Sequence, residues 1–182
     1  MFKKIEILDE TDKHLRTKSI ESELPLSKEE KKLIQRIIDH LTYSQIEEYA
    51  EKYDLRPGMG LAFPQIGINK RIIIIVHEYE DGKFDNYVFV NPKIVSTSEE
   101  IIAAEAGEGC LSVNREIEGH VPRYARVTVE GYDENGNKIR VRAREDLSIA
   151  FQHEIDHLDG ILFYDRINKN KPFFNENEIR LI

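Results

Sequence analysis

The sequence predicts an α+β fold in which antiparallel β-sheets pack around a late helix, with another helix near the N-terminus. Three observations predict it. Residues 27–41 form a capped amphipathic segment, residues 71–143 contain short apolar runs separated by turn residues, and residues 147–159 are mostly apolar over a length that suits a helix. A chain of 182 residues suits one domain with a substantial core, so we expect residues 1–182 to form a single domain.

A capping pattern predicts the first helix. Ser27, followed three residues later by Glu30, matches a capping box, in which each side chain bonds the other residue's backbone N–H. Apolar residues then recur at helical spacing, at Leu33, Ile34, Ile37, Ile38 and Leu41. A shorter helix is expected around residues 46–53, before Pro57-Gly58.

The middle of the chain is predicted to be β-structure. Residues 71–76 include four consecutive isoleucines and a valine, a β-branched run that favours a short buried strand over a helix. A second strand is expected at residues 87–90, ending at Asn91-Pro92. Residues 127–143 contain two alternating runs that flank Asn135-Gly136, which is typical of a β-hairpin.

The last part of the chain is predicted to begin with a helix at residues 147–159, followed by Gly160 in the position that usually ends a helix. Residues 163–165 are expected to be a short extended piece, and residues 168–172 a polar break. Residues 178–182 could add a last strand.

Within the late helix, His153 and His157 lie four residues apart, and Glu154 directly follows the first of them. Positions i and i+4 share one helix face, so both imidazoles can reach one metal ion. Glu154 projects about 100° away, where it can address a water on the metal. The apolar neighbours Ile149, Ala150, Phe151, Ile155 and Leu158 favour a buried helix over a solvated face with two polar histidines.

A catalytic metal site needs a third protein ligand. The only cysteine, Cys110, is one candidate, because a thiolate is a strong ligand for a divalent metal; the alternative is that it is a small buried hydrophobe. Leu111 and Val113 indicate an extended segment around it. The downstream carboxylates Asp159, Asp165, Glu176 and Glu178 are the other candidate ligands.

Residues 58–65, Gly-Met-Gly-Leu-Ala-Phe-Pro-Gln, are a third notable segment. A phosphate loop is rejected, because no Gly-Lys-Ser/Thr follows the glycines. The amide of Gln65 can donate a hydrogen bond to a developing oxyanion without adding charge. The alternative is a simple turn into the following strand.

Composition limits the classes of partner and location. The formal net charge of -8 disfavours a general surface for DNA or other polyanions, and no apolar stretch approaches the roughly 18 residues of a membrane span. A single cysteine excludes an intrachain disulfide and suits a reducing cytoplasm. The first residues lack an apolar core and a small-residue cleavage site, so we expect no signal peptide and a cytoplasmic protein.

Residues 58–65, 108–112 and 152–160 together resemble the three signature motifs of peptide deformylases, in the same order and at similar separations. The resemblance extends over most of the chain, as far as about Asp165, and implies one deformylase-like catalytic domain. It is strongest to the subclass common in Gram-positive bacteria and mycoplasmas. Phe63 departs from the pattern, since the family usually has a second alanine there, and its ring could reshape the wall beside Gln65.

The resemblance implies that Cys110, His153 and His157 bind one divalent metal ion, and that Glu154 is the general base and then the acid. Ferrous iron is the implied native metal, and nickel, cobalt or zinc can replace it. The sequence itself does not choose among them, since cysteine and histidine serve all four.

The resemblance also implies that the side chain of Gln65 and the backbone N–H of Leu111 form an oxyanion hole. It implies substrate-binding positions at Met59, Gly60, Gly109 and Ile149. The two glycines would offer backbone to an extended peptide, and the other two would be pocket walls. Ile149 also follows from geometry, since it lies one turn before His153 on the same helix face.

The predicted activity is removal of the N-formyl group from the formyl-methionine of nascent polypeptides, with release of formate; the ribosome surface is a further candidate partner. One alternative is a metalloprotease with a carboxylate as third ligand, for which Cys110 would be dispensable. The other is a non-catalytic, metal-stabilised module associated with the ribosome, which would have a closed site and no use for a base at Glu154.

Overall fold

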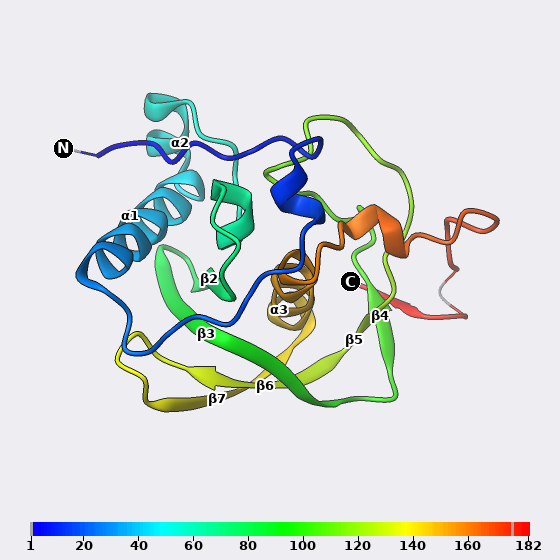
Figure 1. Cartoon of the computed structure of the whole chain (residues 1–182). Coiled ribbons are helices and arrows are strands. Elements are labelled where there is room, and N and C mark those ends of the chain that lie inside the picture. The colour runs from blue at the N-terminus through cyan, green and yellow to red at the C-terminus, as the bar shows by residue number, and fades with distance from the viewer. Residues whose placement is uncertain (1, 176) are drawn as a thin grey trace.

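The computed structural model describes residues 2–175 and 177–182, and has the predicted α+β fold (Figure 1). The helices are α1 (Lys28–Ser44), α2 (Glu47–Tyr53) and α3 (Glu145–Leu158), with short 3₁₀ helices η1 (Lys13–Arg16), η2 (Phe63–Ile66) and η3 (Phe163–Arg166). The strands are β1 (Gly60–Ala62), β2 (Ile72–Glu80), β3 (Lys83–Thr97), β4 (Ile101–Ala103), β5 (Arg123–Tyr124), β6 (Arg126–Tyr132), β7 (Lys138–Arg144) and β8 (Arg180–Leu181).

The described strands form two sheets. One has the order β1-β2-β3-β6-β7 and is antiparallel throughout. The other has the order β5-β4-β8, with β4 antiparallel to β5 and parallel to β8. No helix of the described residues combines the length and the apolar character that crossing a bilayer requires.

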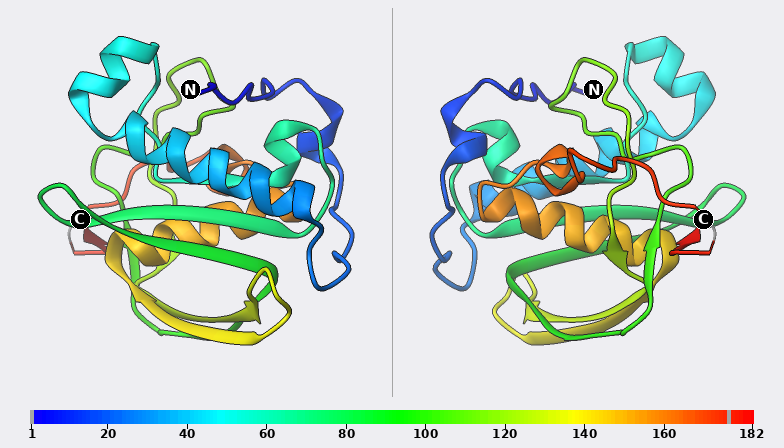
Figure 2. Two further views of the ribbon diagram at one scale, coloured as in Figure 1. Left: turned by 90° about the vertical axis from the view of Figure 1, so that its left-hand side faces the viewer. Right: turned by 90° about the vertical axis from the view of Figure 1, so that its right-hand side faces the viewer.

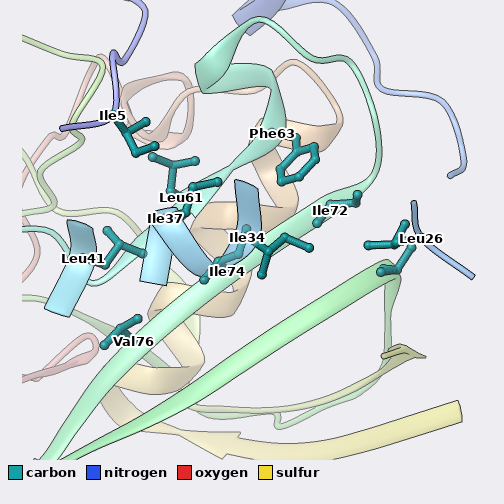
Figure 3. Close-up of a cluster of buried hydrophobic side chains, with 11 residues drawn as sticks. Ile5, Leu26, Ile34, Ile37, Leu41, Leu61, Phe63, Ile72, Ile74 and Val76 are labelled. Atoms are coloured by element: carbon teal, nitrogen blue, oxygen red, sulfur yellow. The ribbon is translucent and has the colours of Figure 1, made fainter. Parts of the chain in front are cut away.

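The position of β2 between two helices explains why its sequence is apolar at every position from Ile72 to Val76. Ile72, Ile74 and Val76 pack in the cluster that contains α1, shown in Figure 3. Ile73 and Ile75 point to the other face and pack with α3. Successive side chains of a strand alternate between faces, and here a helix covers each face, so both sets are buried (Figure 1).

Both long helices begin and end close to where their signals predict. At the start of α1, Ser27 Oγ accepts from the Glu30 N–H at 3.2 Å, and the Glu30 carboxylate accepts from the Ser27 N–H at 2.8 Å. Helix α3 ends at Leu158, and Gly160 follows with φ 73°. The shorter α2 ends at Tyr53, because Asp54 adopts the left-handed conformation before Pro57-Gly58 is reached.

The prediction that the second strand ends at Asn91-Pro92 is wrong, because β3 continues to Thr97. Asn91 has φ 52°, and the register of β3 against β6 shifts between Val90 and Lys93, so a bulge accommodates the proline. The Asn91 side chain bonds both the N–H and the C=O of Ser22, at 2.8 and 3.0 Å. A contact 69 residues away in sequence thus stabilises the irregularity.

Later elements fit the predictions in part. Strands β6 and β7 form the predicted hairpin, whose turn has Gly136 at φ 88°. Residues 163–165 are not extended as predicted but lie in η3, where the Asp165 carboxylate accepts from the Leu162 N–H at 2.8 Å and begins a tight turn. The predicted last strand is present as the shorter β8.

His40 should make folding stability depend on pH. Its Nδ1 accepts from the Ile5 N–H at 3.1 Å, and burial, with a smaller effect of Lys4, lowers its pKa from 6.5 to about 4. As pH falls through 6.5 the histidine of the unfolded chain becomes protonated before that of the folded protein, and the free energy of unfolding falls by about 3 kcal/mol toward pH 4. In His40→Asn, whose amide oxygen can replace Nδ1 as acceptor, denaturant titrations should show this part of the pH dependence removed. An identical pH slope in both proteins would contradict the assignment.

Candidate metal centre and active site

The structure brings the three predicted metal ligands together. Cys110 lies in the segment between β4 and β5, while His153 and His157 share one face of α3. Their ligand atoms all lie within 4.8 Å of one another, and Cys110 Sγ is 3.4 Å from His157 Nε2. One thiol sulfur and two imidazole nitrogens converging in this way fit a divalent transition metal.

A buried ion network orients His153. The Glu108 carboxylate lies 2.8 Å from His153 Nδ1, which leaves Nε2 to face the other two ligands. Arg123, only 2% exposed, donates to Glu108 at 2.7 and 2.9 Å and to Asp156 at 2.6 Å. Burial opposes ionisation of Glu108, but the hydrogen bonds from Arg123 and His153 outweigh it and lower its pKa to about 2.

Sequence reasoning missed this network. The sequence patterns assign no role to Arg123. Glu108 and Asp156 lie inside the motifs at residues 108–112 and 152–160, which also contain the metal ligands. The sequence could therefore have indicated that these two carboxylates belong to the site. Arg123 lies 15 residues from Glu108 and 33 from Asp156, and no spacing rule links such positions.

Glu154 is placed to handle a proton. It is 4% exposed, and within the described part of the chain its Oε2 has no hydrogen-bond partner. Burial raises its pKa to about 7, close to the value that suits a general base at neutral pH. A Cβ at Gly60 would collide with its carboxylate, so glycine in β1 leaves room for the base.

Gln65 has a fixed orientation. Its Oε1 accepts from the Ala62 N–H at 2.8 Å, which turns Nε2 toward Ser112 Oγ at 3.1 Å and Cys110 Sγ at 3.6 Å. The amide therefore presents donors, not an acceptor, to the metal centre. Phe63 is fully buried in the cluster with α1 (Figure 3), so its ring fills the core and does not line the cavity beside Gln65.

The segment after Cys110 differs from the prediction. Instead of being extended it turns, with the Val113 N–H donating to the Cys110 C=O at 3.1 Å. The backbone N–H of Leu111 donates to no acceptor within residues 2–175 and 177–182. The turn thus leaves a free donor directly beside the metal ligand, where an oxyanion could accept from it.

One cavity of about 360 Å³ unites the predicted substrate positions with the reactive groups. Its lining includes Met59, Gly60, Gln65, Gly109, Cys110, Leu111, Ile149, His153 and Glu154. A Cβ at Gly109 would meet nothing within 4 Å, so backbone is open to a ligand at that position.

The alternative carboxylate ligands lie elsewhere. Asp159 pairs with Arg71 at 2.8 Å, and Asp165 pairs with Arg16. Glu178 pairs with Lys171, and Glu176 lies outside the described residues. Among the residues that the structure describes, the group able to hold a metal ion contains the thiol.

Comparisons with known proteins find relatives over most of the chain. The family described as polypeptide deformylase matches residues 4–173. A peptide deformylase of Oceanobacillus iheyensis is 51% identical over 151 residues, 83% of this chain and 82% of the relative. Peptide deformylase 2 of Bacillus cereus is 46% identical over 168 residues, 92% of this chain and 91% of the relative.

Solved structures give the same result. The crystal structure of a peptide deformylase from Thermus thermophilus superposes with a TM-score of 0.73 at 32% identity, over 91% of this chain and 86% of that one. A plant peptide deformylase, PDF1B, gives a TM-score of 0.75 at 30% identity, over 91% and 82%. The chain belongs to the polypeptide deformylase family.

Proposed function

We propose that this protein is a metal-dependent hydrolase that removes the N-formyl group from the formyl-methionine of nascent polypeptides and releases formate. The observation that carries the proposal is the convergence of a thiol, two imidazoles and the buried carboxylate of Glu154 in one cavity. A closed structural site would not need an unpartnered base or an adjoining cavity.

Cys110 Sγ, His153 Nε2 and His157 Nε2 would hold the ion. When bound, the ion supplies Lewis-acid polarisation and makes water in the site more acidic. Glu154 takes a proton from the water whose oxygen attacks the formyl carbon. Gln65 Nε2 and the Leu111 N–H donate to the oxygen that becomes negatively charged. The C–N bond then breaks, Glu154 returns the proton to the departing amine, and formate leaves.

The direct test is formate release from formyl-Met-Ala-Ser by protein purified without oxygen, paired with metal analysis of the same sample. We expect one divalent ion per chain and stoichiometric formate. Cleavage of internal peptide bonds, without formate, would support the metalloprotease alternative instead.

We propose that residues 1–182 form one catalytic domain, which acts in the cytoplasm on formyl-methionyl chains and has the ribosome surface as a further partner. We propose ferrous iron as its native ion. The cavity reaches Cys110, so oxygen can approach the thiolate and the iron together. Iron-loaded protein should therefore lose activity in air, whereas nickel-loaded protein, with the same ligands, should persist. Equal half-lives in air would show that the site protects iron and sulfur.

Gln65→Ala should act on the transition state. Removing the donor that Ala62 orients should lower kcat by about 10²-fold or more, with metal content unchanged. Steady-state kinetics beside metal analysis would measure both. A rise in KM alone would mean that Gln65 merely binds substrate.

A further inference from the structure

Two elements distant in sequence form separate parts of the cavity wall. Ala104 follows β4, and Ile149 lies on α3, one turn before His153. Neither is a metal ligand or a hydrogen-bonding group in the reaction. They belong to one packed apolar group beside the cavity, and the position of that group influences which substrate side chain the cavity admits. Whatever holds the two elements together therefore influences substrate selectivity.

Strand β8 fixes the position of Ala104. It pairs with β4, with Arg180 beside Ile102 and Leu181 beside Ala103. The pairing continues past β8, because the Ile182 N–H donates to the Ala103 C=O at 3.0 Å and the Glu105 N–H donates to the Ile182 C=O at 2.8 Å. These two bonds lie on either side of Ala104 and fix its backbone.

Residues 180–182 also contact α3, the helix that carries Ile149. Ile182 packs against the buried cluster of Ile102, Ala125 and Ile149, so its side chain contacts the group that includes the α3 wall. Arg180 donates two hydrogen bonds of 2.8 Å to the carboxylate of Glu145, the first residue of α3. Both views of Figure 2 show β8, in red, beside the start of α3.

We infer that residues 180–182 form a clamp that sets the width of the cavity for the first side chain of the substrate, with Ile182 as a specificity-determining positioning residue. The inference rests on the proposed function. Ile182 acts through Ala104 and Ile149, because it packs behind the walls and is not part of the cavity lining. It therefore affects the fit of the side chain and leaves the metal ligands and Glu154 in place.

Ile182→Ala tests the clamp in the full, metal-loaded chain. The kcat/KM ratio of formyl-Met-Ala-Ser to formyl-Phe-Ala-Ser should fall by about fivefold, because a yielding wall admits the larger ring and grips methionine less well. The change should appear as a higher KM for the methionine peptide, with kcat within about twofold of wild type. Arg180→Gln should shift the ratio the same way by about twofold, since it breaks the exposed ion pairs of Arg180 with Glu145 and Glu100.

Leu181→Ala is the matched control, because side chains alternate along a strand and Leu181 faces away from Arg180 and Ile182. Its ratio should equal that of wild type. An unchanged ratio in folded Ile182→Ala overturns the clamp, as does an equal shift in Leu181→Ala. If Ile182→Ala does not fold, the same kcat/KM ratio is measured for Ile182→Val, which should shift it in the same direction by a smaller factor, and an unchanged ratio overturns the clamp. Wild-type protein that releases no formate overturns the proposed function as well, whereas active wild type with an unchanged ratio overturns only the clamp.

Discussion

Glu154→Gln is expected to keep its metal and its fold while losing formate release by about 10² to 10⁴-fold, the usual cost of removing a general base. The amide has nearly the same shape as the carboxylate, so it fits the space that Gly60 leaves beside it. It cannot accept the proton of the attacking water. Because Glu154 is buried and its Oε2 has no partner in the described residues, the substitution also removes a costly buried charge.

Single-turnover formate release, metal analysis and thermal unfolding, measured on one preparation, separate these effects. Glu130→Gln is a suitable control, because Glu130 lies exposed on β6 and pairs with Arg140. The control should match wild type in all three measurements. Activity of Glu154→Gln within a few-fold of wild type would rule out the general-base role.

Much of the site could be predicted because its residues lie in short motifs. The spacing of His153 and His157 places them on one helix face whatever surrounds the helix. The sequence alone did not decide whether Cys110 is the third metal ligand, because the downstream carboxylates were equally good candidates. The pairing of Asp159 with Arg71 illustrates why geometry was needed to separate these candidates.

The features that sequence patterns did not predict depend on contacts between distant residues. Strand β3 passes through Asn91-Pro92 because a bulge absorbs the proline and the asparagine bonds Ser22, far away in sequence. Arg123 is buried because Glu108 and Asp156 both face it. Local sequence patterns do not distinguish this arginine from one on the surface, because only folding brings the two carboxylates within hydrogen-bond distance of it.

Cys110→Ala should lose most of its bound metal. Changes to residues that merely orient a ligand already weaken metal binding by about 10 to 10²-fold, so loss of a ligand should cost at least about 10²-fold. The fold should survive, because alanine keeps an apolar side chain among Val113, Val121 and Phe163, which pack around the cysteine. Metal per chain after dialysis against a weak chelator measures the effect, and unfolding curves check the fold.

His120→Asn is the control for this experiment. His120 is also buried, but its Nδ1 accepts from the Phe174 N–H at 3.0 Å, and it is not among the grouped ligands. Its metal content should equal that of wild type. Cys110→Ala protein with full metal and full activity would mean that a carboxylate completes the site, as the metalloprotease alternative requires. The thiolate also distinguishes the two reactions, because only the deformylase proposal makes both metal retention and formate release depend on Cys110.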